Sequence, residues 1–131
     1  MSREIMLDDY SFLVSETDDK GLIKFANNDF CQIAGYAIEE LMGVNHNIVR
    51  HEDMPKIAFE QLWDTIKKGE TWSGYVKNKC KNGDYYWVYA TVYPFMGCDG
   101  NGGYLSCRRK ASRDEIQIHE TLYKTLREQE R

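Results

Sequence analysis

Short apolar runs bounded by turn residues open the chain and predict β-strands. Residues 11–16 and 22–26 are two such runs. The turn Asp18-Asp19-Lys20-Gly21 lies between them, and its composition favours a tight reversal. The pattern therefore predicts an N-terminal β-hairpin.

From Asn27 the apolar spacing becomes helical. It predicts a short helix that ends at Gly35 and a second, from Ile38 to Met42, that ends at Gly43. A polar segment, residues 46–53, then precedes an amphipathic helix that closes at Gly69. The apolar positions that define this longer helix by their i, i+3, i+4, i+7 spacing are Phe59, Leu62, Trp63 and Ile66.

The second half of the chain reads as a long hairpin, a third strand and a terminal helix. Strands are expected over 71–81 and 84–95, because Asn82-Gly83 between them is a strong hairpin signal. A glycine-rich turn, 97–103, leads to a strand at 104–109. Ser112-Arg113-Asp114-Glu115 is a capping box, and it opens a charged helix, 113–129.

Two strands, several helices and three further strands, without strict β–α–β alternation, predict an α+β fold. The sheet is expected to be antiparallel with helices over one face. We expect one domain at 10–110, an N-terminal cap segment at 1–9 and a C-terminal connector helix at 111–131.

Strand alternation predicts which side chains of the hairpin face inward. On 71–81 the inward set is Trp72, Gly74, Val76, Asn78 and Cys80. Asn78 is the polar exception in this apolar set, and a buried amide without a partner costs about 1–3 kcal/mol. Two partners remain open: a backbone or water contact, and the polar edge of a bound heteroaromatic ring. Gly74 leaves room for either a ligand or a close backbone.

Neither face of the strand at 84–95 reads as solvated. The smaller side chains, Tyr86, Val88, Ala90 and Val92, would line a cavity. The opposite set is aromatic and includes Trp87 and Tyr89, so it needs a cover. That cover is either the terminal helix of the same chain or a second subunit.

Composition excludes several classes of function. The 131 residues carry a net charge of −4, which gives no electrostatic footprint for nucleic acid. The four cysteines, at 31, 80, 98 and 107, form no metal-finger spacing, and reduced thiols are expected. Neither a signal peptide nor an apolar run of membrane-spanning length is visible, so a cytoplasmic domain without membrane insertion is expected.

Three separated motifs resemble one family. HNIVRHEDMP (46–55), GETWSGYVKN (69–78) and KNGDYYW (81–87) resemble the PAS domains of bacterial aerotaxis and redox-taxis receptors. The similarity extends from Phe12 to Arg109. It implies a five-stranded antiparallel PAS sheet and a redox sensor that signals to a methyl-accepting-chemotaxis-type transducer, at the inner face of the membrane where the partner is anchored.

The resemblance also implies a cofactor, FAD held without a covalent bond. FAD rather than FMN comes from the family alone. The implied cofactor-binding residues are Asn27, Arg50, His51, Asp53, Trp63, Trp72 and Asn78. The turn at 97–103 is longer than the family pattern. The chain ends at Arg131, so it reads either as a fragment of a receptor or as a free-standing sensor.

Several of these residues have simpler explanations. Arg50 would contact an FAD phosphate or the reduced ring, or form an exposed ion pair with Glu52 or Asp53. Asp53 suits the N-cap of a helix at Met54. His51 would tune flavin protonation or be an ordinary loop residue. Trp63 and Trp72 are equally typical of a plain core.

Two alternatives remain beside the flavin sensor. One is a haem b oxygen sensor with His46 or His51 as axial ligand. The other is a cofactor-free interaction module that forms a homodimer through its terminal helices, with Ile116, Leu122 and Leu126 as the seam. Asn45 is followed by His46 where blue-light sensors of the superfamily carry a cysteine, so a photoadduct is not expected. No nucleophile–base pair or metal cluster points to an enzyme.

Overall fold

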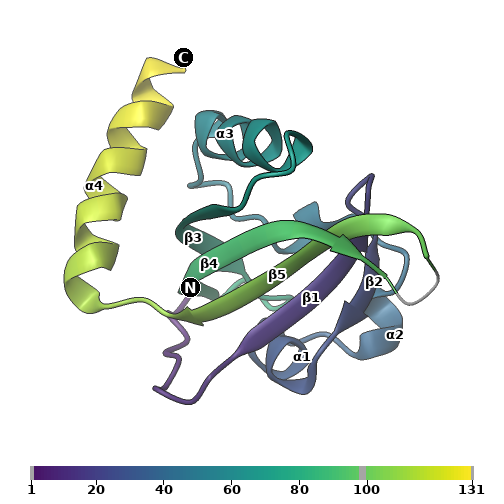
Figure 1. The fold of residues 1–131 in the computed structure, drawn as a ribbon. Coiled ribbons are helices and arrows are strands. Elements are labelled where there is room, and N and C mark those ends of the chain that lie inside the picture. The colour runs from purple at the N-terminus through teal and green to yellow at the C-terminus, as the bar shows by residue number, and fades with distance from the viewer. Residues whose placement is uncertain (1, 98–99, 131) are drawn as a thin grey trace.

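A single five-stranded antiparallel sheet forms the centre of the molecule, with strand order β2-β1-β5-β4-β3 (Figure 1). The computed structural model describes residues 2–97 and 100–130. The strands are β1 (Leu13–Asp18), β2 (Ile23–Ala26), β3 (Trp72–Lys79), β4 (Tyr85–Met96) and β5 (Gly102–Lys110). The predicted α+β class with an antiparallel sheet is confirmed.

Both predicted hairpins are present. β1 pairs with β2 across the Asp18–Gly21 turn, and β3 pairs with β4 from Lys79↔Tyr85 to Trp72↔Val92. β5 begins two residues earlier than expected, at Gly102, because it pairs with Met96 at the far end of β4. Part of the predicted glycine-rich turn, residues 98–99, lies outside the described residues.

The α-helices occupy the intervals that the spacing predicts, and a 3₁₀ helix that was not predicted lies in the polar segment 46–53. They are α1 (Asn28–Ala34), α2 (Ile38–Leu41), the 3₁₀ helix η1 (His46–Val49), α3 (Lys56–Lys67) and α4 (Arg113–Gln129). Gly35 ends α1 with a left-handed backbone (φ 81°), which glycine adopts without steric cost. Ser112 caps α4 by accepting a hydrogen bond from Glu115 N.

The sheet has two differently covered faces. Val76, Asn78, Val88 and Ala90 are buried on the face that packs against α3 and the segment before it. Trp87 lies on the opposite face, where Tyr123 of α4 stacks on it at 6.1 Å between ring centroids. The chain's own terminal helix therefore covers the aromatic side of β4 at Trp87, whereas Tyr89 on the same side stays 38% exposed.

The N-terminal segment completes the sheet beyond the end of β5. β5 pairs with β4 only as far as Val88↔Lys110, which leaves Tyr85 open on that side. The backbone of residues 3–5 fills the place, since Tyr85 N donates to Arg3 O and Ile5 N donates to Tyr85 O. An ion pair of 2.8 Å between Glu4 and Arg113 ties this segment to the start of α4.

Candidate functional site

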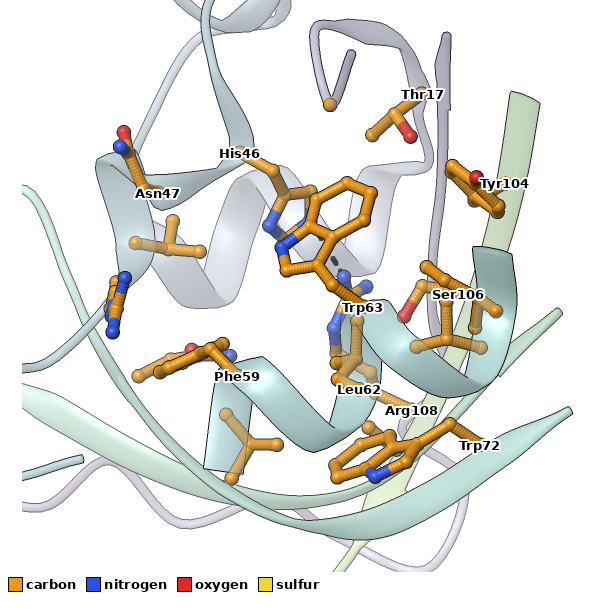
Figure 2. A pocket seen from close by; sticks show the side chains of 18 of the residues that line it. Thr17, His46, Asn47, Phe59, Leu62, Trp63, Trp72, Tyr104, Ser106 and Arg108 are labelled. Carbon is orange, nitrogen blue, oxygen red and sulfur yellow. Dashed lines mark hydrogen bonds between the residues drawn. The ribbon is translucent and has the colours of Figure 1, made fainter. Parts of the chain in front are cut away.

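A cavity lies between the inner face of the sheet and α3 (Figure 2). Its volume is about 130 Å³, whereas one water needs only about 10–15 Å³. Phe59, Leu62 and Trp63 of α3 form one wall, and Trp72 of β3 with Arg108 of β5 lies across from them (Figure 2). The cavity is therefore large enough for more than isolated solvent, and most of its lining is apolar or aromatic.

Four of the seven predicted cofactor-binding residues line this cavity. Trp72 and Asn78 reach it from β3, Trp63 from α3, and Arg50 from the end of η1. A backbone bridge between Arg50 and Asn78 holds η1 against the edge strand. The alternation argument thus placed Trp72 and Asn78 on the correct face of β3.

Trp72 lies along its own strand and covers Gly74. A Cβ at position 74 would come within 2.6 Å of the Trp72 ring, closer than carbon atoms approach in proteins. The missing side chain of Gly74 therefore accommodates the indole, rather than a ligand or a neighbouring backbone. With Trp72 held flat against the strand, the space in front of it stays open.

Arg50 does not form the exposed ion pair that its sequence neighbours suggested. Glu52 pairs with Lys79, and Asp53 pairs with Lys77. The Arg50 guanidinium instead lies 3.8 Å above the ring of Phe59, as a cation–π contact at the cavity wall. Its planar charged group is therefore positioned by an aromatic side chain of α3.

Asn27 lies outside the cavity and has a structural task. Its Oδ1 accepts hydrogen bonds from the backbone N–H groups of Val14 and Phe30, each at 3.1 Å. Its Nδ2 donates to the carbonyl of Phe12 at 2.8 Å. The amide thus caps α1 and fastens it to β1.

Asp53 and His51 also lie outside the cavity lining. The Asp53 carboxylate is 2.8 Å from Lys77 Nζ on the outer face of β3. Burial raises the pKa of Asp53, but the hydrogen bond and charge of Lys77, with other nearby charges, lower it below the usual value. His51 Nδ1 accepts a hydrogen bond from Asp53 N. The expectation that Asp53 caps a helix at Met54 is wrong: α3 begins at Lys56, and Pro55 occupies the N-cap position.

A buried polar cluster that the sequence reasoning missed lies at the base of the cavity. Arg108 is only 4% exposed, and its Nη2 donates to Ser15 Oγ at 3.0 Å and to His46 Nε2 at 2.7 Å. Burial lowers the pKa of Arg108 to about 10, so the guanidinium stays charged at neutral pH. The available signal was alternation along β5, which places Ser106 and Arg108 on one face.

His46 is neutral in this cluster. Burial, and secondarily the charge of Arg108, lowers the pKa of His46 to about 3. Because arginine has only donors, Nε2 of His46 must accept, and the ring proton resides on Nδ1. The imidazole therefore positions Arg108 without adding charge.

Acidification is expected to destabilise the unliganded protein through His46. Between its unfolded pKa of 6.5 and its folded pKa of about 3, the unfolded chain binds more protons, so stability falls as pH falls. Lowering the pH from about 7.5 to about 5 should remove about 2 kcal/mol of unfolding free energy. Urea denaturation at several pH values measures this slope.

The matched variant is His46→Gln, which retains an acceptor for Arg108 but does not titrate. It should lose most of the pH dependence, and the remainder includes the contribution of His51, whose pKa is also lowered by burial. An unchanged slope in this variant would show that His46 is not the titrating group.

The cavity combines apolar and aromatic walls with a few polar groups. Arg108 Nη1 and Ser106 Oγ are buried without any hydrogen-bond partner among the described residues, and both residues line the cavity. Apolar and aromatic walls with a few convergent polar groups are typical of ligand sites. Among the described residues, no cysteine lines the cavity and no cluster of metal-ligating side chains occurs.

Comparison with known proteins agrees with this architecture. The PAS fold family matches residues 23–107. The aerotaxis receptor of Escherichia coli K12 is 50% identical over 120 residues, which are 92% of this chain and 24% of the receptor. The nitrogen fixation regulatory protein of Klebsiella pneumoniae is 27% identical over 123 residues, 93% of this chain and 24% of that protein. The chain thus spans about a quarter of these relatives.

Solved structures show the same fold at lower identity. The blue-light photoreceptor Aureochrome1 LOV superposes with a TM-score of 0.69 at 20% identity, over 84% of this chain and 88% of that one. A PAS domain from Colwellia psychrerythraea gives 0.62 at 21% identity, over 80% and 91%. No helix in the described residues is long and apolar enough to cross a bilayer. With the match over 23–107, these findings show that the chain belongs to the PAS family.

Proposed function

We propose that this PAS domain is a redox sensor that holds a flavin in the cavity beneath α3, and that the flavin is FAD. The observation that carries the proposal is the pairing of aromatic walls with buried polar atoms, Arg108 Nη1 and Ser106 Oγ, that lack partners within the described protein. The 50% identity to an aerotaxis receptor supports the same function. The domain would report the flavin's redox state without catalysing turnover.

The chain's own residues would bind and orient the ring. Trp63 and Trp72 offer flat apolar surfaces, and Asn78 offers an amide that can both donate and accept. Arg50 contributes a cation to the cavity lining. When bound, the flavin supplies the electron chemistry, while the protein sets its surroundings by hydrogen bonds and charge.

The absorption spectrum of the purified protein tests the proposal. A yellow protein that releases FAD on denaturation is the expected result, and released FMN would correct only the identity of the flavin. A Soret band would establish the haem alternative, for which the structure offers little: His46 Nε2 is hydrogen-bonded to Arg108, and His51 lies outside the cavity lining. A colourless protein that takes up neither cofactor would support the interaction module.

The signal would leave the domain through α4. The backbone N–H groups of Lys56 and Ile57, at the start of α3, donate to the Glu130 carboxylate just beyond α4, at 3.2 and 3.1 Å. Arg127 also donates to the carbonyl of Asp53. Trp63, which lines the cavity, lies on the same helix as Lys56 and Ile57. A shift of α3 at the cavity wall would therefore alter the contacts that hold α4.

A cytoplasmic chemotaxis-type transducer or a second copy of the chain would then bind α4 and respond to the change in its position. Ile116 is buried against the sheet and Leu126 packs against the core, so these two side chains of the expected dimer seam are occupied. Leu122 and Ile118 are 45% and 57% exposed. They are the apolar side chains of α4 that a partner would meet.

Hydrogen exchange tests the transmission step. Reduction of the flavin-loaded protein should change exchange at Lys56, Ile57 and the last turns of α4, because their contacts respond to α3. Glu130→Ala, which removes both acceptor oxygens, should uncouple α4 from this change, whereas Glu128→Ala, on the same helix end without a bond to α3, should not. Identical exchange in the oxidised and reduced wild type would contradict the route through α4.

A further inference from the structure

The buried guanidinium of Arg108 has hydrogen-bond acceptors among the described residues at only one of its two terminal nitrogens. Nη2 has two acceptors, Ser15 Oγ and His46 Nε2, but Nη1 has no hydrogen-bond partner. Among the described carboxylates, none forms an ion pair with Arg108. A buried cation without a counter-charge destabilises a fold. The contribution of Arg108 to folding therefore does not explain why a charged residue lies at this position.

Among the described residues, four buried side-chain atoms lack a hydrogen-bond partner, and two of them, on Ser106 and Arg108, belong to residues that line the cavity. Ser106 and Arg108 are two residues apart on β5, so they project from the same face, and both line the cavity (Figure 2). Ser106 Oγ is also buried without a partner. The cavity base therefore presents guanidinium donors beside a hydroxyl that can donate or accept.

The remaining contacts of Arg108 fix its direction. Nη2 is held by β1 through Ser15 and by η1 through His46, and the guanidinium carbon lies 5.1 Å from the centre of the Phe30 ring. None of these neighbours is an anion, and the neutral imidazole contributes only an acceptor. The geometry thus holds the Arg108 cation in one direction and leaves Nη1 without a hydrogen-bond partner among the described residues.

We propose that Arg108, with Ser106, anchors the acceptor edge of the bound ring and raises the reduction potential of the flavin. This inference rests on the proposed function. Two-electron reduction with uptake of one proton leaves one negative charge on the ring, and a fixed cation beside that edge stabilises the reduced form more than the oxidised form. Arg108 is thereby both a ligand anchor and a determinant of the potential.

Binding is tested by titrating unliganded protein with FAD, with Arg108→Met as the variant and Arg109→Met as the control. Arg109 is exposed and lies on the opposite face of the same strand, over Phe12. Arg108→Met should weaken FAD binding at least tenfold while the urea midpoint of the unliganded protein stays equal or rises. Arg109→Met should change neither quantity.

The potential is tested by reductive titration with dithionite, an electron donor, on flavin-loaded wild type, Arg108→Gln and Arg108→Lys. A tenfold loss of preference for the reduced form lowers a two-electron potential by about 30 mV. Arg108→Gln should show at least this shift, and Arg108→Lys, which retains the charge, a smaller one.

The outcomes separate the two proposals. A wild type that binds neither FAD nor FMN refutes the flavin function, and the inference falls with it. A wild type that binds flavin, with Arg108→Met binding equally and Arg108→Gln unshifted in potential, refutes the inference alone. A strong fall in the urea midpoint of unliganded Arg108→Met would assign Arg108 to the fold and also overturn the inference.

Discussion

Asn78→Ala is expected to lose flavin while the domain stays folded. Asn78 is 4% exposed and lines the cavity from the inward face of β3. In the variant, the polar edge of the bound ring loses the amide as its hydrogen-bond partner. Leaving such buried groups unpaired costs about 1–3 kcal/mol. The expected fall in affinity is therefore about ten- to a hundredfold, measured by FAD titration.

Trp72→Ala should weaken flavin binding similarly, because it removes one flat wall of the cavity. Ser73→Ala is the matched control: it lies between Trp72 and Gly74 but faces outward, where its hydroxyl is 3.3 Å from Thr91 Oγ1. Circular dichroism should show the same fold in all three variants. Unchanged flavin occupancy in both Asn78→Ala and Trp72→Ala would refute the assignment of the pocket.

Gly103→Ala should produce the largest loss of stability. A Cβ at this position would lie 2.0 Å from the carbonyl oxygen of Thr17 on β1, a backbone atom that moves only if the strands separate. Overpacking of this kind costs about 1–3 kcal/mol, and the upper end is expected because the β1–β5 pairing must shift. Urea denaturation measures the change.

Gly102→Ala is the control for this prediction. It is the adjacent residue of β5, and a Cβ there meets no atom within 4 Å. The alanine should therefore be tolerated at 102 and not at 103. Equal stability of the two variants would show that the strands do not approach as closely as described.

Local pattern was enough to predict the part of the site carried by β3. Asn82-Gly83 positions the hairpin, and alternation then determines that Trp72 and Asn78 share the inward face. Trp63 follows from helical spacing in the same way. In each case a regular period fixes the direction of the side chain.

The irregular segment before α3 has no such period. Arg50, His51 and Asp53 stand close in sequence, yet Arg50 lines the cavity while Asp53 reaches Lys77 on the outer face. Their directions depend on how η1 ends and how the chain wraps around the edge strand. A motif shared with a family therefore could not separate them.

Arg108 escaped prediction for a different reason. It lies in the run Arg108-Arg109-Lys110, which reads as a solvated basic stretch. Alternation groups Arg108 with Ser106, but the placement of β5 between β1 and β4, with Leu13↔Arg108 and Ala90↔Arg108 as neighbours, is what shows that this face is buried. Burial of this kind arises from contacts distant in sequence.

The most direct test of the central claim follows the three tryptophan indole N–H signals by NMR while unliganded protein is titrated with FAD. Trp63 and Trp72 line the cavity, whereas Trp87 lies on the other face of the sheet beneath α4. We expect the Trp63 and Trp72 signals to shift strongly and the Trp87 signal to shift little. FAD binding that moves only the Trp87 signal, or leaves all three unchanged, would contradict a flavin in this cavity.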